Sequence, residues 1–446
     1  MKLKTLSLAL FLTCSSLVAE PISAEYGSAN NMPDFDQTGT WALVPYMFSS
    51  ESTGFSAGGA AIAQGLLQPQ TTFVASLTYG VEQDVMTNGN PETTNFSAAL
   101  ISYSNIKIPY TTQFFLSFWG YASHWPKEKI YLDGANDSDQ DDALTTSSDS
   151  DYFTMTLTYV LPIGEGIDNP DNVYKMRNGF AMDREAYGNG TPFVTGRTML
   201  DFKAFYQYQT VENWEETEPW NLAKSMPEWN DSGLRFALVH DNTDYDLNPS
   251  RGYNFQVEYS NDFGWSDSLQ SWDSLSFKYS KYLNLSTLSF TQQNVLALNF
   301  YTAYSPSWDT SEEILPGIDA HRPPMWEGPR LGGFNRMRGY ENNRFSGKAA
   351  IYATAEYRAI LDWNPFKTEE LLQKYTPIAI DWFQVVPFVE AGRVNDEYGF
   401  DLLTDLKYDV GISLRALAAE LPVRVDVAVG EEGVNMWVMI RQPFDF

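Results

Sequence analysis

One serine of this 446-residue chain lies in a pattern that is typical of a nucleophile. Gly54, Ser56 and Gly58 match the Gly-x-Ser-x-Gly elbow of serine hydrolases. That elbow needs a buried strand before the serine and a helix after it, whereas the residues here indicate a short hairpin that continues into another strand. We therefore predict no catalytic residue and no enzymatic activity, and keep an outer-membrane hydrolase that uses Ser56 as an alternative.

The histidines do not have the spacing of a metal or acid/base site. His124, His240 and His321 are far apart in the chain. We assign to them neither a metal ion nor an acid/base dyad, and we expect no cofactor.

The segment from Asp133 to Asp151 is rich in aspartate, and the alternate aspartates between 137 and 141 have the spacing of a calcium loop. The sixth position of that loop is Asp142 rather than glycine, and the twelfth is Ser148 rather than glutamate. We expect a solvated surface loop, and the alternative is weak binding of divalent ions that join it to lipopolysaccharide phosphates.

The charge balance excludes one class of partner. The chain has 29 Lys and Arg against 57 Asp and Glu, a net charge of -28, which is opposite to the balance of a nucleic-acid-binding protein. Aromatic residues make up 15% of the chain, too large an apolar content for a disordered protein. No continuous apolar run reaches the roughly 18 residues of a membrane helix.

The beginning of the chain has the pattern of a secretory signal peptide. Two lysines precede an apolar run over residues 6–12, and Ala19 and Ala24 offer cleavage sites. Cys14, the single cysteine, lies within this segment, so we expect no disulfide in the mature chain. The expected organisation is a signal peptide over 1–24, a short N-terminal segment over 25–38 and a transmembrane β-barrel over 39–446.

From Gly39 onward, apolar and polar residues alternate with a period of two, which is the spacing of β-strands. The clearest example is the run of alternating valines from Val423 to Val429, which are separated by Arg424, Asp426 and Ala428. Alternation alone suits both a soluble sandwich and a barrel.

The connections between the strands favour the barrel. Short links near residues 65–68, 108–111, 284–287 and 418–421 alternate with long segments over 122–150, 211–229 and 305–345. Short turns at one end and long loops at the other are typical of outer-membrane barrels. We predict an all-β fold, a single transmembrane antiparallel barrel of about sixteen strands. Two links at the short-turn end, 164–195 and 361–381, are long, and the second contains a helix-like stretch at 368–374.

Several segments resemble one family. Arg330-Leu331-Gly332-Gly333, followed by Met337-Arg338-Gly339-Tyr340, resembles the signature loop of the BamA/TamA superfamily of outer-membrane assembly and translocation barrels. Further matches follow in the expected order, at Ala355-Glu356-Tyr357-Arg358, Phe388-Val389-Glu390-Ala391-Gly392 and Gly411-Ile412-Ser413-Leu414-Arg415. The chain has Glu390 where the family usually has aspartate.

The resemblance implies that the long loop folds back into the barrel and carries Arg338 at its tip. A buried guanidinium must be paired, because an unpaired buried charge costs several kcal/mol. Glu356 and Glu390 fall on the polar parity of the two strands after the loop. We expect Arg338 to bridge both carboxylates, Gly339 to permit a tight turn and Tyr340 to pack against the wall.

The last strand, from Val434 to Gln442 and followed by Phe444 and Phe446, resembles the signal by which barrel precursors are recognised for membrane insertion. The resemblance also implies an imperfect seam with the first strand, over residues 41–48, that can open laterally. Pro443 cannot donate a hydrogen bond to a ladder, so we expect the pairing to fray there.

By resemblance, the protein is a non-enzymatic barrel of the bacterial outer membrane that inserts or translocates protein or lipid. The family's periplasmic POTRA domains have no counterpart in this sequence, so we expect a separate periplasmic partner. The other expected partners are outer-membrane lipid, lipopolysaccharide and a second copy of the chain. The alternative is a passive or plugged pore in which the loop only fills the barrel.

Overall fold

A computed structural model describes residues 40–50, 52–87, 90–173, 176–181, 190–210, 229–315, 318–324, 327–370, 380–418 and 421–444. The expected signal peptide, the N-terminal segment before residue 40 and Phe446 lie outside these ranges. In the part of the chain that is described, no helix is long and apolar enough to cross a membrane.

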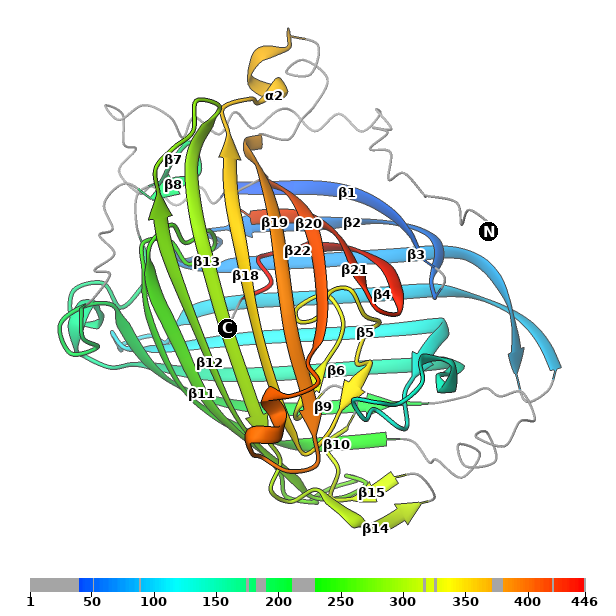
Figure 1. Cartoon of the computed structure of the whole chain (residues 1–446). Helices are drawn as coiled ribbons and strands as arrows, with labels where there is room; N and C mark the ends of the chain where they lie inside the picture. The colour runs from blue at the N-terminus through cyan, green and yellow to red at the C-terminus, as the bar shows by residue number, and fades with distance from the viewer. Residues whose placement is uncertain are drawn as a thin grey trace.

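The chain forms one sixteen-stranded sheet that curls into a barrel, and each strand pairs antiparallel with the next (Figure 1). In pairing order the strands are β1 (Thr40–Ser50), β2 (Gly54–Gln64), β3 (Thr72–Thr87), β4 (Asn90–Lys107), β5 (Phe114–Ile130), β6 (Leu144–Val160), β9 (Arg197–Gln209), β10 (Trp229–Thr243), β11 (Gly252–Asp262), β12 (Trp272–Leu285), β13 (Thr291–Tyr304), β18 (Ala349–Leu361), β19 (Ile380–Asn395), β20 (Lys407–Ala418), β21 (Leu421–Gly430) and β22 (Gly433–Ile440). The predicted all-β barrel of about sixteen strands is confirmed.

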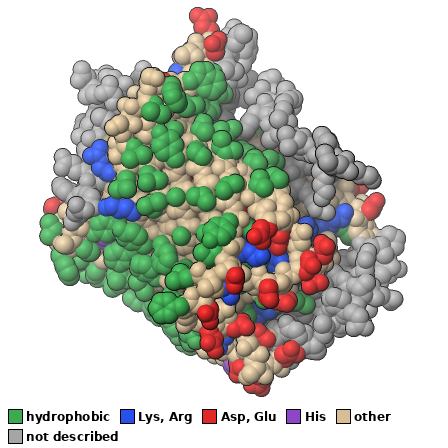
Figure 2. Space-filling model, viewed as in Figure 1, with side chains coloured by type: hydrophobic (Ala, Val, Ile, Leu, Met, Phe, Trp, Pro, Cys, Tyr) green, Lys and Arg blue, Asp and Glu red, His purple; other side chains and the backbone are tan. Residues whose placement is uncertain are grey.

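The period-two pattern separates an apolar outer face from a polar interior, as in barrels that lipid surrounds. On the outer face, large side chains such as Leu77, Phe153 and Val389 are about half exposed or more. Figure 2 shows apolar side chains spread over the wall, whereas acidic side chains gather toward the end that carries β14 and β15. Inside, charged side chains such as Glu356 and Glu390 are fully buried.

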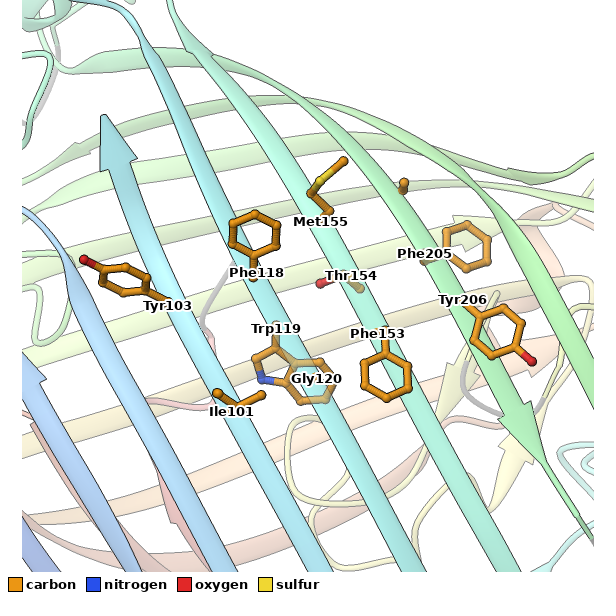
Figure 3. A pocket seen from close by; sticks show the side chains of 11 residues that line it. Ile101, Tyr103, Phe118, Trp119, Gly120, Phe153, Thr154, Met155, Phe205 and Tyr206 are labelled. Carbon is orange, nitrogen blue, oxygen red and sulfur yellow. The ribbon is translucent and has the colours of Figure 1, made fainter. Parts of the chain in front are cut away.

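A shallow apolar groove of about 470 Å³ interrupts the outer face over β4, β5, β6 and β9 (Figure 3). Gly120 lies between Ile101 and Phe153 in one cross-strand row. A Cβ atom at Gly120 would lie 3.0 Å from the Phe153 ring. The groove therefore exists where the row has no side chain and an aromatic ring leans over the gap.

The long-loop end carries the connection from β13 to β18, which contains two small hairpins, β14 (Asp309–Leu315) with β15 (Ile318–Ala320) and β16 (Arg330–Leu331) with β17 (Phe345–Ser346). The predicted loop over 122–150 is shorter than expected. β5 and β6 continue their ladder as far as the pair Ile130 and Leu144, so the connection is residues 131–143 with a 3-10 turn, η1 (Gln140–Asp142).

The short-turn end carries the two long links that the sequence indicates. The link between β6 and β9, residues 161–196, contains a 3-10 turn, η2 (Gly164–Gly166), and a hairpin of β7 (Met176–Arg177) and β8 (Phe180–Ala181). A short helix, α2, spans Pro365–Thr368, because the side chain of Asn364 accepts from the amide of Phe366 and proline suits the first helical turn. It reaches the start of the helix-like stretch predicted at 368–374, in which Glu370 is helical as well. Residues 371–374 lie outside the described ranges.

The two end strands depart from the expected seam. In the described residues β1 pairs only with β2, and β22 only with β21, so the sheet is not closed by a ladder. After Ile440 the chain turns into the barrel, where Phe444 packs with Tyr282, Val295 and Ala297. Phe444 therefore does not continue the apolar outer face of β22, because the polypeptide leaves the strand direction at Arg441, whose φ is 75°.

Candidate functional site

The connection from β13 to β18 forms a compact loop at its tip. Gly332 and Gly333 have φ values of 106° and 109°, in the region that favours glycine. The amide of Gly332 donates to the carbonyl of Arg336 at 3.1 Å, and its carbonyl accepts from the amide of Asn343 at 3.3 Å. These bonds close residues 332–343 into a loop, which we call the latch loop.

The latch loop ends in a turn that lies inside the barrel. The amide of Tyr340 donates to the carbonyl of Met337 at 3.0 Å. Met337 has a φ of 55° and packs in a buried cluster with Leu331, Tyr340 and Phe345. The turn therefore fixes the direction in which Arg338, its next residue, projects.

Arg338 has three carboxylate partners, none of which is exposed to solvent. Its Nη2 atom lies 2.9 Å from Oε1 of Glu356 on β18, and its Nε atom lies 3.1 Å from Oε1 of Glu390 on β19. Its Nη1 atom lies 3.4 Å from Oδ2 of Asp426 on β21. The guanidinium carbon also lies 3.4 Å from the centre of the Phe388 ring. The structure thus brings Arg338, Glu356 and Glu390 into direct contact and adds Asp426.

The electrostatics of the site keep Arg338 charged. Burial opposes the charged form, but Glu390, Glu356 and Asp426 outweigh it and raise the pKa of Arg338 well above its ordinary value. Glu390 also accepts a hydrogen bond from the backbone amide of Arg338. The guanidinium itself presents three nitrogens of one plane to Glu390, Glu356 and Asp426, which an ammonium group cannot match.

The carboxylates are shared with other buried arginines. Glu356 accepts from Nη2 of Arg415 and from Nε of Arg358, each at 2.8 Å. Asp426 forms an ion pair with Arg424. Counting that of Arg338, four guanidinium groups therefore surround the carboxylates.

The sequence analysis missed Asp426 and the three additional arginines as members of the site. All four lie on the polar parity of strands that the pattern identified, so the signal was present in the alternation itself. What the pattern lacks is the distance across the barrel, which decides which inward side chains the loop reaches.

Gly339 and Tyr340 hold the tip against the wall. Gly339 lies in the turn, as expected, but its φ is not positive. Glycine is required there because a Cβ atom would lie 2.5 Å from Cβ of Asp409 and 2.7 Å from the amide nitrogen of Gly430. The hydroxyl of Tyr340 donates to the carbonyl of Tyr408 at 3.1 Å. Burial raises the pKa of Tyr340 to about 12.

The latch loop reaches β22, and Arg344, directly after it, reaches the connection from β21 to β22. Nε1 of Trp437 on β22 donates to the carbonyl of Arg338 at 2.8 Å. Arg344, which is fully buried, pairs with Glu432 at 2.8 Å and donates to Ser138 through Nη1 at 2.8 Å.

Ser138 belongs to the aspartate-rich connection between β5 and β6, which was expected to be a solvated surface loop. The carbonyl of Gly134 accepts from the amide of Ser346 at 2.8 Å. The connection is therefore docked on the connection between β13 and β18, while its residues Asp139, Asp141 and Asp142 are exposed, as expected. In the described residues no group of three or more His, Cys, Asp or Glu is placed to hold a metal ion.

The other chemically suggestive residues lie elsewhere. Ser56 is buried at the start of β2, and its hydroxyl donates to the carbonyl of Thr53 at 3.1 Å, where strand rather than helix follows. His124 forms a hydrogen-bonded dyad with Asp149 that its spacing in the sequence does not indicate: its Nδ1 lies 2.7 Å from Asp149, and its Nε2 lies 2.9 Å from Thr94. His124 and Asp149 face each other across β5 and β6, so the ladder itself brings them together.

The remaining histidines do not join this dyad. His240 on β10 shares a hydrogen bond of 3.0 Å with Thr198, and His321 contacts Ser271 in the long-loop region.

We also compared the chain with known protein families and solved structures. The family model described as the Omp85 superfamily domain matches residues 109–435. No curated protein matches the chain. Among solved structures, BamA from Haemophilus ducreyi lacking POTRA domains 1-3 is 13% identical, with a TM-score of 0.47, over 91% of this chain and 69% of that one.

Two further structures are similar in fold. CdiB from Escherichia coli is 11% identical with a TM-score of 0.52, over 90% of this chain and 62% of that one. CdiB from Acinetobacter baumannii is 12% identical with a TM-score of 0.48, over 90% of this chain and 59% of that one. This chain therefore spans about three fifths of the length of the CdiB chains, and identities this low show the fold alone.

Proposed function

The chain belongs to the Omp85 superfamily, and from this premise we propose that it is a non-enzymatic barrel of the bacterial outer membrane that takes part in the insertion or translocation of protein or lipid. The apolar outer face supports the location, because side chains such as Leu77 and Val389 suit contact with acyl chains. In the membrane we place the long-loop end on the extracellular side and the short-turn end on the periplasmic side.

The observation that carries the proposal is that Arg338 lies beside β22, a strand at the edge where the described sheet is not closed by a ladder. Arg338 binds carboxylates of β18, β19 and β21, and its carbonyl accepts a bond from Trp437 of β22. In the described residues β22 has no ladder partner on its other edge, and neither has β1. Free backbone groups of an edge strand favour pairing with an added strand, most strongly where lipid offers no alternative partner.

A reconstituted assay tests this function. The purified barrel would be placed in liposomes, an unfolded outer-membrane barrel protein would be added, and its folded fraction would be followed by electrophoresis without heating. We expect the protein to accelerate folding and Arg338→Ala to lower the rate, while Arg251→Ala, at an exposed turn residue, leaves it unchanged. A rate equal to that of empty liposomes overturns the insertion activity.

The second candidate is a plugged pore, which the occupied interior favours. The latch loop and Phe444 both lie inside the barrel. In planar bilayers, a steady current that Arg338→Ala raises, without any effect on folding of added proteins, supports this candidate instead.

We propose outer-membrane lipid and lipopolysaccharide around the wall, a separate periplasmic partner, and a second copy of the chain as candidates. Affinity purification from intact envelopes identifies which of them accompanies the barrel.

A further inference from the structure

The described parts of the link between β6 and β9, residues 161–173, 176–181 and 190–196, lie at the short-turn end of the barrel. Near its start, Asp171 pairs with Lys107 at the end of β4 at 2.9 Å. Asn172 donates to Asp246, in the turn between β10 and β11, at 3.3 Å. This part of the link is therefore held by β4, on the far side of β6, and by the turn after β10, on the far side of β9.

The hairpin of the same link reaches the opposite wall. Phe180 packs against Ile360, Trp382 and Leu417, whose side chains are fully buried and lie on β18, β19 and β20. Between β9 and β19 in the sheet order lie β10, β11, β12, β13 and β18, so this contact spans the mouth of the barrel.

Gly179 allows the hairpin to approach this wall. Nε1 of Trp382 donates to the carbonyl of Gly179 at 3.3 Å. Gly179 has a φ of 78°, and a Cβ atom there would lie 2.5 Å from Cδ2 of Leu417. Both its conformation and its surroundings require glycine, so the backbone itself is fitted to the wall.

The residues after β22 cross the same mouth in another direction. Gln442 accepts a hydrogen bond from Arg415 and lies 3.4 Å from Asn248, in the turn between β10 and β11. Phe444 packs on β12 and β13, with the guanidinium carbon of Arg358 5.0 Å from the centre of its ring.

We propose that the β7–β8 hairpin and the residues 441–444 form an inner cap that closes the periplasmic mouth and makes a second constriction in series with the latch loop. The hairpin is the movable part of the cap. Its apolar seat, formed by Ile360, Trp382 and Leu417, lies next to polar inward side chains such as Arg358, Gln384 and Arg415. The Phe180 side chain and the carbonyl of Gly179 contact this seat, and both contacts can form and break without unfolding the wall.

Crosslinking tests whether the hairpin occupies the seat in the membrane. Phe180→Cys combined with Leu417→Cys is expected to form a disulfide under mild oxidation in intact outer membranes. The matched pair, Phe193→Cys with Leu417→Cys, uses an aromatic residue of the same link that is 76% exposed, and we expect it to remain reduced. Equal crosslinking of the two pairs overturns the docking.

Conductance tests whether the docked hairpin is a constriction. Two constrictions in series each limit the current, so Phe180→Asp and Arg338→Ala together are expected to raise the current severalfold above Arg338→Ala alone. Phe193→Asp is expected to add nothing. If Phe180→Asp fails to fold, the oxidised and reduced forms of the Phe180→Cys and Leu417→Cys protein, made with Arg338→Ala, give the same comparison.

The outcomes separate the cap from the proposed function. A current that Phe180→Asp leaves unchanged in the Arg338→Ala background, or that reduction of the disulfide leaves unchanged, overturns the cap. Either result leaves the liposome folding assay, and so the proposed insertion activity, unaffected.

Discussion

Arg338 and Glu356 form an ion pair in which Nη2 and Oε1 are 2.9 Å apart, and neither side chain is exposed to solvent. One partner lies on the latch loop and the other on the wall, so the pair fixes a long connection inside the barrel. Burying two charges is costly in itself, and a pair of this kind is more informative about position than about net stability. Removing Arg338, however, takes the guanidinium from Glu390, which keeps only the hydroxyl of Tyr352 among the side-chain donors described for it, whereas Glu356 keeps Arg358 and Arg415.

Loss of Arg338 is expected to destabilise the barrel strongly. Arg338→Ala leaves three carboxylates without their shared cation, and we expect the free energy of unfolding to fall by about 3–5 kcal/mol. Arg338→Lys restores the charge but not the planar geometry, so its loss should be smaller yet measurable. Urea unfolding in detergent or liposomes measures both, with Arg251→Ala as the control, and equal stability of Arg338→Ala and the wild type contradicts the expectation.

Glu356 is expected to matter more than Glu390. Glu356 accepts from Arg338, Arg358 and Arg415, whereas Glu390 accepts from Arg338 and from the hydroxyl of Tyr352. Glu356→Gln therefore weakens three cation contacts and Glu390→Gln one. We expect the lower unfolding midpoint for Glu356→Gln, and the reverse order would show that the shared carboxylate is not the centre of the network.

Gly339→Ala is expected to displace the tip of the latch loop. The added Cβ atom meets backbone and Cβ atoms of the wall at 2.5–2.7 Å, which no side-chain rotation relieves. Gly399→Ala is the control, because a Cβ atom there meets nothing within 4 Å. Limited proteolysis of the loop should become faster in Gly339→Ala only, and equal rates in both variants would refute the close approach.

Phe444→Ala separates two roles of the C-terminal residues. If Phe444 stabilises the folded barrel from inside, its removal lowers the free energy of unfolding by roughly 3 kcal/mol, as for a buried aromatic ring. If it acts only as a signal for insertion, the amount of barrel in the membrane falls while unfolding stays the same. Phe400→Ala, at a residue that is 90% exposed, is the control for both measurements.

The sequence predicts the fold because a membrane barrel has one dominant constraint, the alternation of lipid-facing and inward side chains. That alternation also predicts that Glu356 and Glu390 face inward, and both carboxylates lie inside the barrel. The pattern gives strand ends less well: β5 and β6 extend past their predicted limits because polar residues such as Ser148 continue to pair beyond the apolar zone.

Contacts across the barrel are not visible in a period-two pattern. Asp426 joins Arg338, and Phe180 reaches Trp382, because the curvature of the sheet brings distant strands together. The inward turn of Phe444 was missed for a related reason. In the sequence, Phe444 alternates in step with the apolar residues of β22, which predicts an outward side chain. The strand ends at Ile440, however, so the alternation does not extend to Phe444.

The most direct test of the account is a double-mutant cycle between Arg338 and Glu390. Unfolding free energies would be measured for the wild type, Arg338→Ala, Glu390→Gln and the double variant. Residues in one ion-pair network have coupling energies of about 0.5–3 kcal/mol, and we predict a value in the upper half of that range. Additivity of the two single changes, within about 0.5 kcal/mol, would contradict a latch in which Arg338 is held inside the barrel by the wall.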